Sequence, residues 1–307
     1  MSGPDLVRLA GETIRRGSKS FAAASRLFDR DTQAGAVLLY AWCRHCDDVV
    51  DGQALGFGSA APADGDAPLA ALVSQTRAAL AGEPVADPAF AGLQAVARRH
   101  GIPERYPLQH LAGFRMDVEA RRYRTLADTL EYAYHVAGVV GVMMGYVMGV
   151  RDEAVLDRAS DLGLAFQLTN MARDIVEDAE VGRVYLPETW VEEAGIPPGE
   201  VARPEHRARL AGLAARLVAA AEPYYASAAI GIGALPFRSA WAIATARGVY
   251  RQIGLAVVAR GPHAWDRRVS TSRAAKIGHA ARGFAAALAS RWPRPSRPRV
   301  GLYARPG

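Results

Sequence analysis

The 307-residue sequence is poor in cysteine and almost free of lysine. Its 2 cysteines, Cys43 and Cys46, cannot hold a domain of this size together by disulfides, which favours a reducing compartment. Of the 37 basic residues only Lys19 and Lys276 are lysines, and every other positive charge is an arginine. Positive charge therefore comes almost entirely from planar guanidinium groups, which suit carboxylate and phosphate partners.

Long apolar runs are also absent. The longest, residues 136–150, contains four glycines and is shorter than the roughly 20 residues that a membrane-spanning helix needs. The N-terminal residues lack the apolar core of a secretory signal peptide. We therefore expect a cytoplasmic protein whose membrane contact, if any, is peripheral.

Strand signals are missing, because no alternating runs of β-branched or aromatic residues occur between hairpin turns. Alanine, leucine and arginine instead recur at helical spacing, which predicts an all-α protein. Residues 1–290 are expected to form a single domain. The predicted helices cover 5–28, 31–51, 67–81, 88–100, 104–122, 126–150, 153–180, 204–230, 235–260 and 271–291.

Charge is divided unevenly along the chain. Residues 238–307 carry 14 basic residues and one acidic residue, a net charge of +13, whereas residues 1–237 carry 23 basic and 30 acidic residues, a net charge of −7. A basic third of this kind can meet phosphates of nucleic acid, of lipid head groups or of a small diphosphate. The tail, 291–307, has four prolines and five arginines, so we expect it to be disordered and available for electrostatic attraction to a membrane.

A polar stripe interrupts the apolar helix predicted over 31–51. Asp47 and Asp51 are four residues apart and share one face, and Arg44 and Tyr40 precede them on the same stripe. Like charges at this spacing destabilise a bare helix, so the oxygen pair favours a bound cation, and hard oxygen ligands suit Mg²⁺. A solvated acidic helix end is the alternative, and the stripe alone does not decide between them.

A second polar stripe has the spacing of a core-facing seam. Its members stand at offsets of 0, 3, 7 and 11: Gln167, Asn170, Asp174 and Asp178. Apolar neighbours place the same helix against a core, where polar side chains are costly unless a charged ligand lies between them. Arg173, next to Asp174, could reach an anion held there.

The two stripes together predict a metal-dependent site. If the helices face each other, their oxygens form a cage for several Mg²⁺ ions, which would bind diphosphate and neutralise the charge that develops when it leaves. The reaction class that follows is ionisation of an allylic diphosphate.

Five motifs give the chain a resemblance to a known family. In order they are GSKSF (17–21), DDVVD (47–51), YHVAG (134–138), NMARDIVED (170–178) and GRVYLP (182–187). They resemble the squalene/phytoene synthases, and the resemblance runs from residue 17 to about residue 290. It implies an isoprenoid-synthase helical bundle around a central cavity. Segments such as EPYYASA and AWDRRVSTS resemble the branch that joins two geranylgeranyl diphosphates head to head into 15-cis-phytoene, through a cyclopropyl diphosphate.

The resemblance also implies roles for individual residues. The metal ligands would be Asp47, Asp51, Asn170, Asp174 and Asp178. The residues that contact diphosphate would be Ser18, Lys19, Ser20, Tyr40, Arg44, Gln167, Arg173 and Tyr250. Tyr134 matches a tyrosine near the reacting carbons. The implied cofactor is Mg²⁺, with Mn²⁺ as a substitute and no NADPH.

A glycine stripe lies in the segment 136–150. Gly138, Gly141, Gly145 and Gly149 stand at offsets of 0, 3, 7 and 11, and each costs about 1 kcal/mol relative to alanine inside a helix. A closely packed neighbouring helix or a prenyl chain in the groove would offset this cost. We favour helix packing, and the two explanations can coexist.

Three alternatives remain open from the residues alone. One is a squalene or dehydrosqualene synthase that uses two farnesyl diphosphates, and another is a class I terpene cyclase. The third is a non-catalytic helical module that binds nucleic acid or membrane through its basic end. Binding of nucleic acid is not expected, because two carboxylate stripes repel phosphate without a metal.

Overall fold

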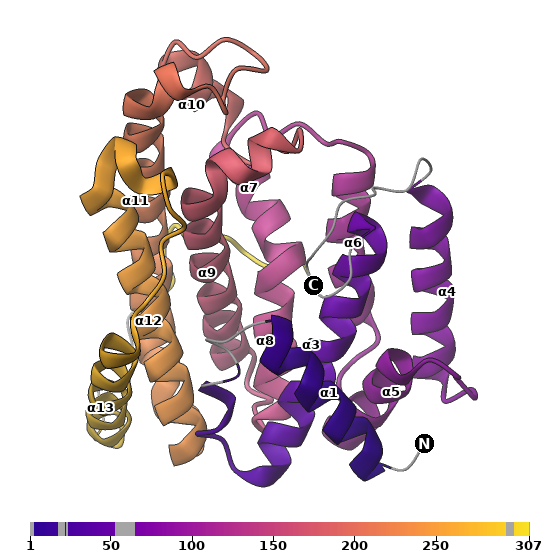
Figure 1. Ribbon diagram of the computed structural model, residues 1–307. Helices are drawn as coiled ribbons and strands as arrows, with labels where there is room; N and C mark the ends of the chain where they lie inside the picture. Colours follow the sequence, from indigo (N-terminus) through magenta and orange to yellow (C-terminus); the bar gives the residue numbers. More distant parts are fainter. Residues whose placement is uncertain (1–2, 18–21, 23, 53–64, 293–297, 307) are drawn as a thin grey trace.

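The computed structural model describes residues 3–17, 22, 24–52, 65–292 and 298–306, and the regular structure within them is helical (Figure 1). The all-α prediction is therefore confirmed. The longer helices are α1 (Gly3–Gly17), α3 (Arg30–Asp51), α4 (Asp66–Ala81), α5 (Pro88–His100), α6 (Arg105–Val118), α7 (Leu126–Ala133), α8 (Val139–Val147), α9 (Glu153–Glu180), α11 (Arg207–Gly231), α12 (Phe237–Arg260) and α13 (Arg273–Ala289). The short helix α10 (Glu188–Glu193) was not predicted.

Local capping explains why the two helices with polar stripes begin and end where they do. Asp29 accepts a hydrogen bond from the backbone N–H of Thr32 and starts α3, and Asp152 accepts from the N–H groups of Ala154 and Val155 and starts α9. At the other end of α3, Gly52 adopts φ +60°, a left-handed conformation that glycine tolerates best. The helix ends are therefore encoded locally.

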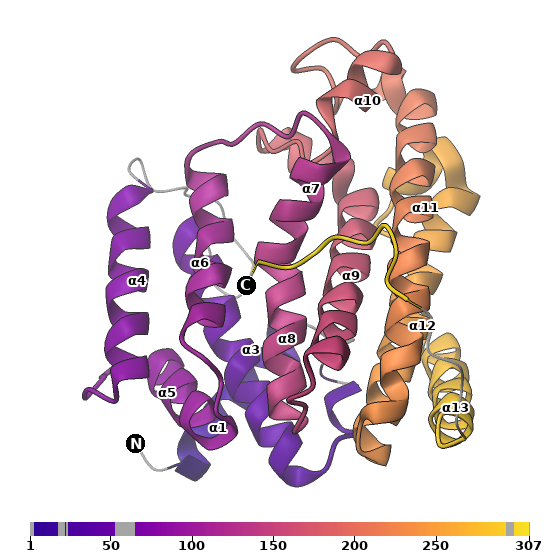
Figure 2. The ribbon, with the colours of Figure 1, turned by 180° about the vertical axis from the view of Figure 1, so that it is seen from behind.

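The long helix α9 stands in the middle of the bundle. In both views it lies beside α8 on one side and beside α11 and α12 on the other (Figures 1 and 2). Two clusters of buried side chains pack the bundle, one around α3, α5 and α8 and the other around α9 and α11. Among the described residues, no helix is both long enough and apolar enough to cross a bilayer.

The segment predicted as one helix over 126–150 is two α-helices joined by a π-helical turn, Tyr134–Gly138. The N–H of Val139 donates to the carbonyl of Tyr134, five residues back, so the turn is wider than an α-helical one. The helix predicted over 5–28 was too long at its end, because residues 26–28 form a turn and a bend.

The glycine stripe lets α8 and α9 approach closely. A Cβ atom built on Gly141 would lie 2.3 Å from the carbonyl oxygen of Ala159 in α9, and one built on Gly163 would lie 2.2 Å from the carbonyl oxygen of Ala137. Helix packing is therefore the main reason for Gly138, Gly141 and Gly145. A Cβ on Gly149 would meet no atom within 4 Å, and its left-handed φ of +85° explains the glycine there. Gly141 and Gly163 also border the central cavity described below, so both explanations hold for them.

Replacing Gly141 by alanine is expected to destabilise the protein by about 1–3 kcal/mol, because backbone atoms of α9 must move to admit the methyl group. The matched control is Gly212→Ala in α11, where an added Cβ meets no atom within 4 Å. That change should stabilise the protein by up to about 1 kcal/mol through helix propensity. Chemical denaturation of both variants measures the difference, and equal stabilities would contradict the packing explanation.

The C-terminal tail is not disordered over residues 298–306. This segment runs across the back of α9 and α11 (Figure 2). Its anchor is Arg299, whose Nε and Nη2 atoms donate to both carboxylate oxygens of Asp161 in α9, at 2.8 and 2.7 Å. Composition alone suggested disorder, whereas a buried carboxylate on the domain supplies a specific partner.

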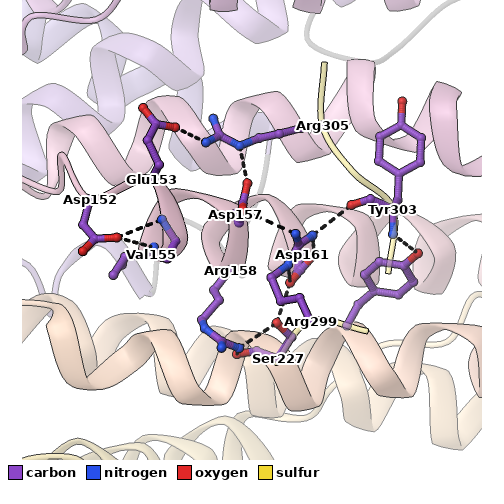
Figure 3. Close-up of polar contacts among 12 residues, drawn as sticks. Asp152, Glu153, Val155, Asp157, Arg158, Asp161, Ser227, Arg299, Tyr303 and Arg305 are labelled. Carbon is purple, nitrogen blue, oxygen red and sulfur yellow. Dashed lines mark hydrogen bonds and ion pairs between the residues drawn. The ribbon is translucent and has the colours of Figure 1, made fainter. Parts of the chain in front are cut away.

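Further contacts fasten the same segment (Figure 3). Arg305 donates to Asp157 at 2.5 Å and also pairs with Glu153. The N–H of Tyr303 donates to the hydroxyl of Tyr224 at 3.2 Å. We call residues 298–306 the C-terminal strap. Two of its arginines are thus engaged with carboxylates, which removes them from the membrane role expected of a free tail.

Candidate active site

A cavity of about 1230 Å³ lies inside the bundle, between α3, α6, α8, α9, α12 and α13. It exceeds the roughly 300–1,000 Å³ typical of drug-sized ligands, so it suits a large substrate. Part of its wall is apolar, with Phe28, Leu39, Val140 and Met144 among the lining residues. The rest is polar and is built from the two predicted stripes.

The stripe on α3 faces the cavity with all four of its members, Tyr40, Arg44, Asp47 and Asp51. Arg44 forms a close ion pair with Asp47 through Nη1, and a longer one with Asp48 at 3.9 Å. Burial raises the pKa of Asp47 to about 6, an effect that Arg44 partly offsets. A desolvated carboxyl of this kind gains from a cation placed beside it.

The stripe on α9 faces the same cavity with Gln167, Asn170, Asp174 and Asp178. Arg173 donates to Asp174 through Nε at 2.7 Å and pairs with it again through Nη2. Burial, followed by the like charge of Asp174, raises the pKa of Asp178 to about 7. The Oδ1 atom of Asn170 is buried and has no hydrogen-bond partner among the described residues.

Arg183 links the two stripes. It lies in GRVYLP, donates to Asp51 on α3, and with Arg173 partly opposes the raised pKa of Asp178 on α9. Burial raises the pKa of Asp117 on α6 to about 6, and Arg183 opposes this effect together with hydrogen bonds donated by Tyr132 and Tyr185 at 2.9 Å each. Arg183 and Asp117 had no predicted role, although the motif containing Arg183 was noted.

The polar wall continues onto the segment before and within α13. Arg268 donates to Asp174 at 3.0 Å and to Glu177 at 2.7 Å. Lys276 also lines the cavity. The scarcity of lysine was the one sequence signal that could have singled out Lys276.

Tyr250 on α12 lines the cavity as well, with its ring stacked on Phe166 at a centroid distance of 4.1 Å. Burial raises the pKa of its hydroxyl, and the guanidinium of Arg173 opposes this effect. Among the predicted diphosphate residues, Ser18, Lys19 and Ser20 lie outside the described residues.

The structure does not bring Tyr134 to the cavity. Its side chain is fully buried, its hydroxyl donates to Gln109 at 2.7 Å, and its ring lies 5.7 Å from that of Tyr303 in the C-terminal strap. The role of Tyr134 near the reacting carbons therefore stays a prediction. It stands in the π-helical turn, where Val136 and Ala137 face the cavity instead.

The polar wall has the donor chemistry of a divalent-cation site. Three of its carboxylates, Asp47, Asp51 and Asp174, are paired with arginines. Within the described part of the chain no three acidic, cysteine or histidine groups converge tightly enough to hold an ion as they stand. The unpartnered oxygen of Asn170 and the raised pKa values of Asp47 and Asp178 nevertheless show groups that a cation would satisfy. Oxygen donors of this kind suit Mg²⁺ and Mn²⁺.

Asp178 is expected to make the metal-free protein less stable as pH rises from about 4 to about 7. The pKa of the Asp178 carboxyl is about 7 in the folded protein, and 3.8 is the reference value for the unfolded chain. Between these two pH values the folded state therefore binds more protons than the unfolded state. Its contribution to stability is thus complete below the lower value and is lost as pH rises through 7.

Thermal melting in a chelator, compared between the wild type and Asp178→Asn, measures this contribution. The variant should lose much of the decline, because the amide does not titrate. Buried histidines with lowered pKa values, such as His110 at about 4, act in the opposite direction below about pH 6.5, but they do so equally in both proteins and cancel in the comparison. Parallel profiles for the two proteins would contradict the assignment.

The comparisons with known proteins agree with this geometry. The sequence profile of the squalene/phytoene synthase family matches residues 14–275, most of the chain. The chain belongs to this family. It is 54% identical to a phytoene synthase of Pseudescherichia vulneris over 308 residues, and 53% identical to a 15-cis-phytoene synthase of Pantoea ananas over 309 residues, covering all of both chains each time.

A solved structure of a family member shares the fold. The crystal structure of a dehydrosqualene synthase matches with a TM-score of 0.84 over 94% of this chain and 98% of that chain, at 24% identity. The expected helical bundle around a central cavity is thus confirmed.

Proposed function

We propose that the protein joins two molecules of geranylgeranyl diphosphate head to head into 15-cis-phytoene, releasing two diphosphates and two protons. The observation that carries the proposal is the identity of 53–54% to phytoene synthases along the entire chain. The cavity agrees with it, because one wall is apolar and the other presents arginines and carboxylates. No net oxidation or reduction occurs in this condensation, so no NADPH is needed.

The residues that would hold Mg²⁺ are Asp47, Asp51, Asn170, Asp174 and Asp178. Bound there, the metal would neutralise charge on the departing diphosphate. The support is that all five line one cavity. Mn²⁺ fits the same oxygen donors.

The chain's own cations have a separate task. Arg44, Arg173 and Arg183 lie on the polar wall with their guanidinium groups paired to carboxylates, so they are held in position before an anion arrives. We propose that Tyr40, Arg44, Gln167, Arg173 and Tyr250 contact the diphosphates. Preorganised donors of this kind stabilise developing negative charge without reorganisation.

The apolar wall performs the third task. Side chains such as Leu39, Val140 and Met144 surround the space beside the polar wall, so prenyl chains would fold against them and water would be excluded. The mutual placement of the two chains makes the carbon–carbon bond-forming step intramolecular in effect.

The experiment that tests the proposal is incubation of the purified protein with Mg²⁺ and either C15 or C20 allylic diphosphate, without NADPH, followed by mass analysis of the extract. A C40 hydrocarbon from the C20 substrate alone is the expected result. A C30 product from the C15 substrate would replace it with dehydrosqualene synthesis, and a cyclic product of one diphosphate would indicate a cyclase.

A further inference from the structure

One face of α13 is apolar and exposed to solvent. Ile277 exposes 72%, Phe284 43% and Leu288 48% of their surface, and Trp292, just beyond the helix, exposes 63%. The spacing of the first three residues, seven and then four, places them along one side of the helix. Exposed alanines fill the positions between them: Ala274, Ala281 and Ala285. We call this surface the α13 outer face.

The α13 outer face is not needed for the core. The helix lies at the edge of the bundle beside α12 (Figure 1), and its packing is made by the opposite side, where Gly283 meets Thr245 and Gly248 meets His279. Phe284 packs edge-on against Phe237 and Trp241 of α12, with ring centroids 5.4 Å apart in each pair. The more exposed side chains Ile277, Leu288 and Trp292 therefore form the open part of the face. Large apolar side chains gathered on one exposed face mark interaction surfaces more often than chance exposure does.

The charge around this face selects its partner. The sequence after Asp266 contains no acidic residue, and four exposed basic residues outside the cavity wall occur up to the end of the helix region: Arg267, Arg273, Arg282 and Arg291. A second copy of the chain would bring one basic helix against another. Nucleic acid would leave the apolar stripe in water. An anionic bilayer fits both the basic residues and the apolar stripe, because phosphate head groups meet the arginines while the apolar side chains enter the interface.

The same helix also borders the cavity. Lys276 and Ala280 line its wall from the inner side of α13, together with Thr245 and Ala246 of α12. If the outer side of α13 lay against a bilayer, this helix alone would separate the bilayer from the cavity.

We propose that the α13 outer face docks the protein on anionic lipid bilayers, with Ile277, Leu288 and Trp292 as the inserting side chains. Docking itself is independent of the proposed function. Only its use, the exchange of apolar substrate and product between bilayer and cavity, rests on that function.

The test is co-sedimentation of the full chain with vesicles, either of phosphatidylcholine alone or with about one-third phosphatidylglycerol. The triple variant Ile277→Gln, Leu288→Gln, Trp292→Gln should bind the anionic vesicles at least tenfold more weakly, because three large apolar side chains no longer enter the interface. The matched control is Val300→Gln, which changes a side chain that is 82% exposed on the C-terminal strap and should bind as the wild type does.

Three outcomes would overturn the inference. These are wild-type binding by the triple variant, equal binding of the wild type to both vesicle types, and a change of oligomeric state in ultracentrifugation without a change in vesicle binding. The last would assign the face to a second copy of the chain.

Phytoene formation by the triple variant in detergent should match the wild type, and its loss would place these residues in the fold instead. Failure of the proposed function is distinguishable, since no C40 product would form from any variant while vesicle binding persisted.

Discussion

Replacing Asp174 by asparagine is expected to lower phytoene formation by about 10²–10³-fold at saturating substrate. Asp174 lies on the polar wall and pairs with Arg173 from α9 and Arg268 from the segment before α13, so it joins two parts of the site. Loss of one preorganised electrostatic contact to a developing charge typically has an effect of this size. The isosteric amide removes the negative charge and leaves the volume unchanged.

The matched control is Glu180→Gln, which removes a carboxylate from the same helix at an exposed position outside the cavity wall. It should retain wild-type turnover. Rates are measured by product extraction across a range of Mg²⁺ concentrations, with circular dichroism as the check on folding. Turnover by Asp174→Asn within tenfold of the wild type would exclude Asp174 from the group of metal ligands.

Replacing Arg299 by alanine is expected to destabilise the protein by about 3–5 kcal/mol and lower its melting temperature by about 10 °C. The reason is Asp161, which is 0% exposed and receives two hydrogen bonds from this guanidinium. Removing one partner of a buried ion pair leaves the other charge desolvated, which costs much more than losing a surface pair.

Two comparisons separate this mechanism from a general loss of the strap. Arg305→Ala removes a guanidinium whose partners, Asp157 and Glu153, are 29% and 62% exposed, so its effect should be smaller. Asp161→Asn combined with Arg299→Ala should melt above Arg299→Ala alone, because no buried charge remains. Additive effects in this cycle would contradict the buried-pair explanation.

The helices and the two stripes were predictable because their signals are local. Asp29 and Asp152 mark helix starts, and a seam such as Asn170, Asp174 and Asp178 is visible at helical spacing. The arginines that complete the wall were not predictable. Arg183 and Arg268 reach their carboxylates only through the path of the chain after α9 and after α12.

Two further features could not be predicted, for physical reasons of the same kind. Tyr134 was placed by its motif, but the π-helical turn follows a wider hydrogen-bonding pattern than the α-helix assumed for 126–150, and its hydroxyl bonds to Gln109. The strap was interpreted from proline and arginine content alone. Composition does not reveal that the helical domain carries a buried carboxylate, Asp161, with which the strap can pair.

The position of Lys276 on the cavity wall gives the molecule a built-in chemical reporter. Amine-selective acylating reagents find only Lys19, Lys276 and the terminal amino group in this chain. A diphosphate ligand that fills the cavity would shield Lys276 from acylation, while the amino terminus would continue to react. The ratio of the two modified peptides in a mass spectrum would then measure site occupancy in the unaltered protein, without a fluorophore or an engineered residue.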